Sequence, residues 1–503
     1  MISVRSFTKT RAILFFLILL MLGMACDRLP MVKIPEEPKE RLTAFITYLS
    51  SDELEGRGTG TAGNKKAAYY IRELFKSFGL QPLGNEYYQE FKVVTEVQLG
   101  EGNSLVTRTH GQEQSWEVGT DFMPMPFTEN QSATGKVAFV GYGISAPDLN
   151  YDDYSGIDPE GKIVIIMRES PDYEDPHGKF SDYVSLSYKI RNAREHKVAG
   201  VLFVNPPSDT ADELYTLKRV QGDMQAGVPA IHVKQSVVTS ILPESQLFEA
   251  LEEGIKSTMK PASFDIPDVE IEMNPSVKLI EKPTWNVVGI VPGNDPKLSK
   301  EYIIVGAHYD HLGWGQEGSR YTGEEPAIHH GADDNASGVA AMLEVAKHIG
   351  ENPQPRSVVF IAFGAEEMGA LGSAYYCKNP LVPLENTVLM LNLDMVGRLQ
   401  ENKLQVTGTG TSSAWDSLID TLSNHHGLEV SKSADGYGPS DHASFYSQNV
   451  SVLNLFTGLH DDYHKPSDTV DKINFDGLLT IAQFARDIVV RVAHLEKRPD
   501  FVK

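Results

Sequence analysis

Apolar residues recur at intervals of three and four in two segments near the start of the chain, residues 42–49 and 67–78. This spacing predicts two amphipathic helices, and Gly79 stands where a glycine commonly ends a helix. The segment 51–58 between them contains two glycines and is expected to form a loop. Short apolar stretches within residues 87–106 are expected to be strands.

The pattern changes between residues 127 and 272, where short apolar stretches alternate with clusters of glycine, proline, asparagine and aspartate. Strands are predicted at residues 137–140, 163–167, 201–204 and 230–233, and a helix at residues 185–196. No constellation typical of a metal site or a nucleophile falls in this region. We interpret residues 127–272 as an inserted, β-rich accessory domain.

From about residue 283 onward, apolar runs alternate with helical patterns, notably the pattern at residues 339–349. The runs are nearly continuous, as buried strands of a mixed or parallel sheet should be. They cover residues 302–307, 358–363, 388–393 and 452–456. The fold class predicted is therefore α/β, with a mixed, largely parallel central sheet flanked by helices.

The first residues carry a different signal. An apolar run at residues 12–24 follows three basic residues and is too short to span a bilayer, which is typical of a secretion signal. Residues 22–26 (LGMAC) loosely match a bacterial lipobox, so we expect cleavage before Cys26 and lipidation of its thiol. A plain cleaved signal or a signal anchor is the alternative. The proline-rich residues 27–40 are expected to be a tether.

Composition limits the partners. A chain of 503 residues is too long for one compact core, so two or three domains are expected. Its 45 basic and 68 acidic residues give a formal net charge of -23, which argues against nucleic acid or an anionic membrane as the main partner. With Cys26 lipidated, Cys377 is left without a disulfide partner and is expected to be a small packing residue.

Five side chains with metal-binding chemistry stand after predicted strands or in loops. They are His308 in AHYDH, Asp334 in GADDNASG, Glu367 in GAEEMG, Asp394 in NLDMVG and His464 in DYHKPSDT. Ligand sites in open α/β sheets gather outside the carboxyl ends of strands, so this placement favours a common site. Two imidazoles and three carboxylates can hold a pair of zinc-like ions if one carboxylate bridges them.

The neighbouring residues leave alternatives at the first two positions. Asp310 can accept a hydrogen bond from the second ring nitrogen of His308 and fix its tautomer, so we place Asp310 with the catalytic residues. His311 is a rival metal ligand. Asp333 and Asp334 are adjacent, and either can face a metal, whereas a helix N-cap by Asn335 or Ser337 is the structural alternative.

The acidic residues after the next two strands suggest a division of roles. Neighbouring side chains in a loop point in different directions, so of Glu366 and Glu367 one can bind metal while the other faces the substrate as a general base. Asp394 ends an apolar strand, where an unpaired charge is costly to bury. Either a metal ion or an arginine such as Arg398 would compensate it.

Together these motifs resemble the secreted bacterial di-zinc aminopeptidases, whose relatives include glutamate carboxypeptidase II, the transferrin receptor and the glutaminyl cyclases. Residues 49–80 look like the N-terminal helices of that family, and residues 127–272 look like an inserted protease-associated domain. The resemblance implies five regions: a lipoprotein signal peptide at 1–26, a tether at 27–40, peptidase segments at 41–126 and 273–503, and the protease-associated domain between them.

The resemblance also implies the role of each residue. His308 and Asp394 would hold one zinc ion, Glu367 and His464 the other, and Asp334 would bridge the two. It further implies that Glu366 is the general base, that His442 in SDHAS lines the substrate side, and that a cis peptide bond joins Asp334 to Asn335.

The function implied is hydrolysis of a peptide, with two Zn²⁺ per chain, by a water shared between the ions. Glu366 would take the proton of this water and pass it to the leaving amine. Release of N-terminal residues is expected. A carboxypeptidase is the nearest alternative, but Arg320 and Arg398 are the only arginines near the motifs. A single-zinc glutaminyl cyclase and a non-catalytic binding module are further alternatives. We expect an exported protein, attached to a bacterial membrane only through its lipid and facing the periplasm or the cell surface.

Overall fold

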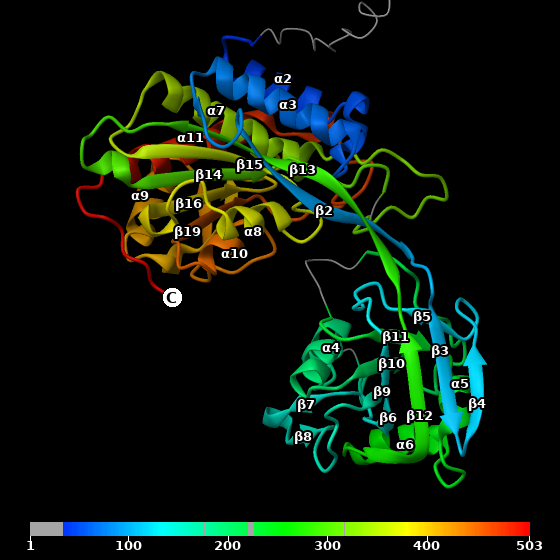
Figure 1. Ribbon diagram of the computed structural model, residues 1–503. Helices are drawn as coiled ribbons and strands as arrows, with labels where there is room; N and C mark the ends of the chain where they lie inside the picture. The colour runs from blue at the N-terminus through cyan, green and yellow to red at the C-terminus, as the bar shows by residue number, and fades with distance from the viewer. Residues whose placement is uncertain (1–33, 176, 220–225, 316) are drawn as a thin grey trace, which may run out of the picture.

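The computed structural model describes residues 34–503 except 176, 220–225 and 316, and it shows two lobes (Figure 1). The expected signal peptide and Cys26 lie outside the described residues. The first lobe contains both ends of the described chain. Strands β2 (Tyr88–Leu99) and β13 (Val277–Val291) run side by side from this lobe to the second, and residues between them form the second lobe.

The first lobe is an α/β structure, as expected. Its helices are α2 Pro38–Leu49, α3 Ala62–Ser77, α7 Gly338–Glu351, α8 Leu371–Lys378, α9 Trp415–His426, α10 His442–Tyr446 and α11 Phe475–Ala493. Its remaining strands are β1 Gln81–Pro82, β14 Tyr302–His308, β15 Ser357–Phe363, β16 Thr387–Leu393, β17 Lys403–Thr407, β18 Glu429–Ser433 and β19 Val452–Phe456. The four strands predicted here agree with β14, β15, β16 and β19 to within one residue.

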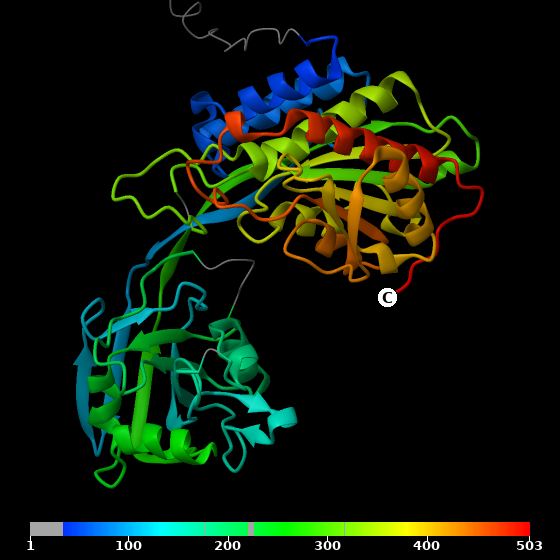
Figure 2. The ribbon, with the colours of Figure 1, turned by 180° about the vertical axis from the view of Figure 1, so that it is seen from behind.

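The central sheet has the order β1-β13-β15-β14-β16-β19-β17-β18, with β2 paired to β13. Its middle strands β15, β14, β16 and β19 are parallel, whereas β13 is antiparallel to β15, and β17 is antiparallel to β19 and parallel to β18. Helices α2, α3, α7 and α11 cover one face, and α8 and α10 cover the other (Figures 1 and 2). Both faces of the middle strands are therefore buried, which explains their unbroken apolar runs.

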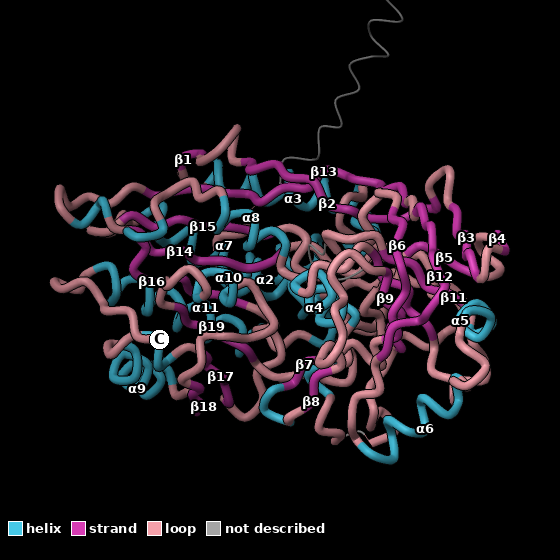
Figure 3. Tube along the Cα trace, turned by 60° about the horizontal axis from the view of Figure 1, so that its bottom comes forward, coloured by secondary structure: helices cyan, strands magenta, loops and turns pink. Residues whose placement is uncertain are grey.

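The second lobe is built on an eight-stranded sheet with the order β4-β3-β12-β6-β9-β10-β11-β5, and Figure 3 separates it from the first sheet. Its strands are β3 Ser104–Thr109, β4 Gln112–Trp116, β5 Phe122–Pro124, β6 Ala133–Phe139, β9 Ile163–Met167, β10 Gly200–Val204, β11 Ala230–Val233 and β12 Phe264–Asn274, with a small sheet of β7 Ser145–Ala146 and β8 Tyr151–Asp152. Its helices are α4 Leu186–Glu195, α5 Gln235–Ile241 and α6 Phe248–Thr258.

Three expectations need correction. The second lobe begins earlier than residue 127, because β3, β4 and β5 pair into its sheet. Residues 87–106 form one long strand, β2, and the start of β3 rather than several short strands, because β2 pairs with β13 along the connection between the lobes. The tether ends before residue 40, because α2 begins at Pro38, and proline is favoured in the first turn of a helix.

None of the helices in the described part of the chain combines the length and the apolar character that a bilayer span requires.

The start of α7 is closely packed against the end of β16. A Cβ on Gly338 would lie 2.2 Å from the carbonyl oxygen of Leu393 and 2.3 Å from Asn335 Oδ1. We expect Gly338→Ala to lower the free energy of unfolding by about 1–3 kcal/mol, because the backbone must shift to admit the methyl group. Urea denaturation of the purified protein measures this loss.

Gly254→Ala is the matched control. Gly254 is an exposed residue of α6, and a Cβ there would meet nothing within 4 Å. This variant should gain roughly 0.5–1 kcal/mol, because alanine is the better helix former. Equal stability of Gly338→Ala and the wild type would show that the packing between α7 and β16 is looser than described.

Candidate metal centre

The carboxyl ends of the parallel strands bring the predicted ligands to one edge of the sheet. His308 is the last residue of β14, Asp394 directly follows β16, and Glu367 follows β15 by four residues. Asp334 lies in the segment Ala332–Ser337 that precedes α7, and His464 lies in the loop after β19. All five side chains come from connections at the carboxyl side of strands, as expected for an open α/β sheet.

The carboxylate of Asp334 is shared between two groups of ligands. Its Oδ1 lies 3.3 Å from His308 Nε2, which in turn lies 3.4 Å from Asp394 Oδ1. Its Oδ2 lies 3.2 Å from His464 Nε2, which also lies 3.2 Å from Glu367 Oε2. Each oxygen of Asp334 thus lies beside an imidazole that a further carboxylate also contacts, which is the arrangement expected of a bridging ligand. The peptide bond from Asp334 to Asn335 is cis, as the resemblance implied.

The spacing of these atoms fits zinc. Ligands bound tetrahedrally at 2.0–2.1 Å from Zn²⁺ are separated from one another by about 3.3 Å. Both histidines also present Nε2 to the cluster while Nδ1 faces a backbone carbonyl, that of Asp310 at 3.3 Å for His308 and that of Gly318 at 2.8 Å for His464. Such contacts fix the tautomer of a metal-binding imidazole.

The shifted pKa values of the clustered side chains indicate that this site favours bound positive charge. Burial alone would raise the pKa of Asp334, but three neighbouring imidazoles hold it well below its ordinary value. Against the effect of burial, hydrogen bonds to Asp334 and Glu367 raise the pKa of His464 to about 10. Without a cation, protonated imidazoles balance the carboxylates, and a divalent ion bound between these atoms would take over that role.

Glu366 stands beside the group formed by His308 and Asp394, with its Oε2 3.9 Å from His308 Nε2. Burial and the nearby carboxylates, among them Asp441 and Asp394, raise its pKa well above the ordinary value of a glutamate. By contrast, contacts with His311 and His464 lower the pKa of Glu367 to about 2, even though burial opposes this. The two adjacent glutamates therefore differ as expected, one poised to hold a proton and the other ionised.

The alternatives left open by the sequence are resolved by geometry. The carboxylate of Asp333 accepts hydrogen bonds from the backbone N–H of Gly397 and from His460, so it faces away from the cluster. Arg398 pairs with Asp462 and Asp468 rather than with Asp394. His311 donates to Glu367 Oε1 at 2.6 Å and so supports a ligand of the second group.

Asp310 differs from expectation. Its carboxylate accepts hydrogen bonds from the backbone N–H of Glu366 at 3.0 Å and of Glu367 at 3.3 Å, whereas His308 Nδ1 is 3.9 Å from the carboxylate and closer to the carbonyl oxygen of Asp310. Asp310 thus orders the loop that carries both glutamates. The sequence did not indicate this, because the loop lies 56 residues away.

His442 is buried close to the cluster. Its side chain is only 1% exposed, and a Cβ on Gly438 would lie 2.7 Å from its Nε2. Burial lowers the pKa of His442 to about 4, and the charge of Asp394 acts in the opposite direction. Within the part of the chain that the structure describes, neither of its ring nitrogens has a hydrogen-bond partner. That His442 lines the substrate side stays a prediction.

Comparisons with known proteins agree with this geometry. The profile of Peptidase family M28 matches residues 286–489, which include all five ligands and Glu366, and that of the PA domain matches residues 127–241. Residues 286–489 therefore form a domain of peptidase family M28. The inserted lobe carries the PA domain, the protease-associated domain that the resemblance implied.

Relatives of this chain are known from both sequence and structure. Aminopeptidase YwaD of Bacillus subtilis is 25% identical over 93% of this chain and 88% of its own length, and an aminopeptidase of Pseudomonas aeruginosa is 24% identical over 84% and 74%. The solved structure of an aminopeptidase from Aneurinibacillus sp. strain AM-1 covers 92% of this chain and 95% of its own, at 23% identity and a TM-score of 0.54. This structural likeness shows that the fold is shared.

The sequence analysis did not identify two residues next to the metal-binding cluster, Arg57 and Tyr463. Arg57 is fully buried and donates hydrogen bonds to the carbonyl oxygens of Tyr309, His330 and Gly331, at 2.8, 2.8 and 2.9 Å. Tyr463 stacks on His464 with ring centroids 3.8 Å apart. Its pKa is raised by burial and by four carboxylates of the cluster, so its hydroxyl lies within their field and stays protonated.

The hydrogen bonds of Arg57 connect the segment that follows His308 with the segment that precedes Asp334. Burial lowers its pKa to about 10, partly offset by Asp334 and other acids, so it remains charged near neutral pH. We expect Arg57→Met to reduce the free energy of unfolding by about 3–5 kcal/mol, because it removes a buried cation and leaves several carbonyls unpaired. Urea denaturation measures the loss.

Arg72→Met provides the control. Arg72 pairs with Glu73 at 2.6 Å, but both side chains are partly exposed, so its loss should cost less than about 1 kcal/mol. Equal free energies of unfolding for the two variants would contradict the claim that the hydrogen bonds of Arg57 stabilise these loops.

Proposed function

We propose that this protein is a di-zinc aminopeptidase whose ligands are those predicted from the sequence. The observation that carries the proposal is the position of Asp334, whose two oxygens each lie beside a histidine that a further carboxylate also contacts, with Glu366 beside one of these groups. His308 and Asp394 would hold one ion, His464 and Glu367 the second, and Asp334 would bind both. When bound, two zinc ions lower the pKa of a water molecule and polarise a substrate carbonyl.

Glu366 performs the proton transfer in this proposal. Its side chain belongs to neither group of ligands but lies beside one of them, with Oε2 3.9 Å from His308 Nε2. As a carboxylate it would accept a proton from water and return it to the nitrogen of the leaving amine. The hydroxyl of Tyr463 is a neutral donor in the same field, suited to stabilise negative charge that develops on the carbonyl oxygen. Asp310 keeps Glu366 in place through its backbone.

The arginines near the cluster bear on the choice between an aminopeptidase and a carboxypeptidase, which needs a cation for the terminal carboxylate of its substrate. Arg398 is engaged by two aspartates and Arg57 is buried against carbonyl oxygens, whereas Arg320 is exposed beside the ring of Tyr463 and is the arginine that such an enzyme would use. A single-zinc cyclase would hold one ion with largely the same side chains, so the number of zinc ions bound per chain distinguishes it from a di-zinc peptidase. The relatives from B. subtilis and P. aeruginosa carry the name aminopeptidase.

The location of the enzyme is a separate proposal that rests on the sequence. A basic segment, a short apolar run and the LGMAC segment support export and attachment through a lipid on Cys26. α2 begins at Pro38, so about a dozen residues separate Cys26 from the folded lobe. The enzyme would then act at a membrane surface on peptides outside the cytoplasm.

Replacing the general base separates catalysis from metal binding. Glu366→Gln keeps the size of the side chain but removes the proton acceptor, so kcat should fall by about 10²–10⁴-fold. The zinc content, measured by mass spectrometry of the same sample, should stay that of the wild type. As a control, Glu401→Gln removes an exposed carboxylate that pairs with Lys403 and should leave kcat unchanged. Wild-type turnover by Glu366→Gln would reject the assigned role.

The end of the peptide that is cleaved can be tested with blocked substrates. We expect hydrolysis of peptides that have a free amino terminus and an amidated carboxyl terminus, and no hydrolysis when the amino terminus is acetylated. The rate of product release, followed by chromatography, measures this preference. The opposite pattern, with hydrolysis requiring a free carboxyl terminus, would indicate a carboxypeptidase instead.

A further inference from the structure

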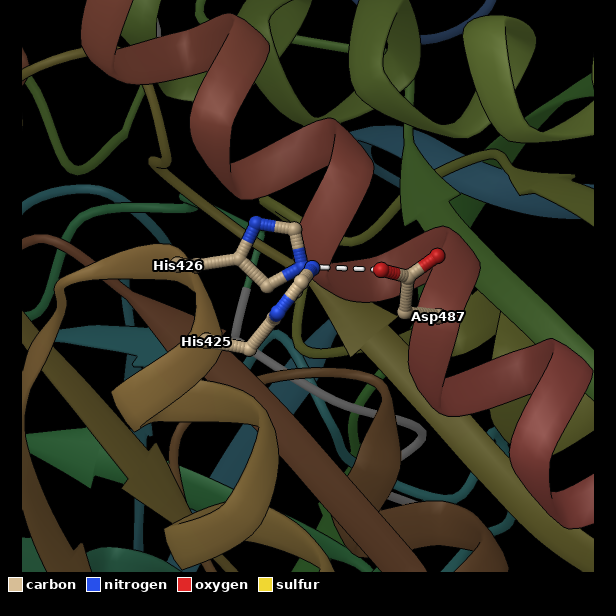
Figure 4. Close-up of side chains that lie close together, drawn as sticks. All are labelled: His425, His426 and Asp487. Atoms are coloured by element: carbon tan, nitrogen blue, oxygen red, sulfur yellow. Dashed lines mark hydrogen bonds and ion pairs between the residues drawn. The ribbon is translucent and has the colours of Figure 1, made fainter.

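A second cluster of metal-binding side chains lies between α9 and α11, outside the M28 ligand set. Figure 4 shows His425 and His426 at the end of α9 with ring nitrogens directed at the carboxylate of Asp487 on α11. His426 Nε2 is 2.9 Å from Asp487 Oδ2. One potential ligand atom from each of the three residues lies within 4.8 Å of the other two.

The end of α9 brings the two histidines together. They are the last two residues of the helix, and Gly427, with φ of 65°, ends it. Their ring centroids are 5.0 Å apart and the rings are nearly perpendicular, at 89°. The C-terminal end of a helix carries partial negative charge from its free carbonyl groups, which favours a cation at this position.

Two of the three side chains are already held in place. The ring of His426 is only 8% exposed and packs edge-on against Phe484, with centroids 5.9 Å apart. Arg486 pairs with Asp487 Oδ1 at 2.8 Å, which leaves Oδ2 directed at His426. Although burial opposes it, these two contacts hold the pKa of Asp487 below its ordinary value, so the carboxylate is ionised. His425 is exposed and can rotate toward them.

We propose that His425, His426 and Asp487 bind one divalent cation of the zinc type, separate from the proposed catalytic pair. Imidazole nitrogens with a single carboxylate suit Zn²⁺, Cu²⁺ and Ni²⁺, whereas Mg²⁺ requires oxygen ligands. A bound ion would replace the hydrogen bond between His426 and Asp487 and join the end of α9 to α11. Because the ion binds only the folded arrangement, it would stabilise this edge of the first lobe.

Equilibrium dialysis of the full chain against Zn²⁺, followed by metal analysis, tests the proposal. His425→Ala removes an exposed ligand with little effect on packing, and Asp487→Asn removes the charged ligand without changing its size. Each variant should bind one zinc ion fewer than the wild type at the same free Zn²⁺. Dialysis against Mg²⁺ in place of Zn²⁺ should reveal no such difference.

His494→Ala is the matched control, since His494 is an exposed histidine at the C-terminal end of α11 whose Nδ1 contacts a backbone carbonyl. It should bind as much zinc as the wild type, and His425→Ala should keep full peptidase activity. The difference between wild type and variant does not depend on how many ions the M28 centre holds. Equal zinc content in wild type, His425→Ala and Asp487→Asn would overturn the proposal and leave His426 and Asp487 as an ordinary hydrogen-bonded pair.

Discussion

The crowding of acidic side chains at one edge of the sheet is the constraint on which the rest of this structure depends. Asp334, Glu366, Glu367 and Asp394 lie around His308 and are all largely buried, with side-chain exposures from 4 to 16%. Burying several like charges is costly unless positive charge is bound among them. Two divalent cations that share one carboxylate would supply this positive charge, and they would also supply the electrophile that hydrolysis requires.

Buried hydrogen bonds from the surrounding fold hold the loops that carry these side chains. Asp468 Oδ2 accepts hydrogen bonds from the backbone N–H of Asp333 and Asp334, while Arg57 binds carbonyl groups of the loops on either side. Asp310 orders the glutamate loop in the same manner. In each case a buried charged group binds backbone groups of the loops, so these hydrogen bonds help to set the positions of the ligands.

The sequence predicted what depends on local pattern. The strands that end at or just before His308 and Asp394 follow from unbroken apolar runs, whereas Asp334, Glu367 and His464 were recognised from motifs in the loops. Arg57 and the role of Asp310 could not be found in this way, because most of their partners lie between 56 and 277 residues away and are mostly backbone groups. The same limit applies to His442, whose motif indicated a functional position but whose burial depends on how the preceding loop folds over it. The sequence analysis placed the start of the second lobe too late, at residue 127. Strands β2 and β13 form the connection between the lobes, and their composition does not distinguish this connection from the lobes themselves.

Anomalous X-ray scattering at the zinc absorption edge, from crystals of the full-length protein, tests the central claim most directly. The account predicts two strong peaks roughly 3.5–4 Å apart, one on each side of the Asp334 carboxylate, with Glu366 next to them but bound to neither. A single peak at this edge of the sheet, or two peaks that do not share Asp334, would contradict it.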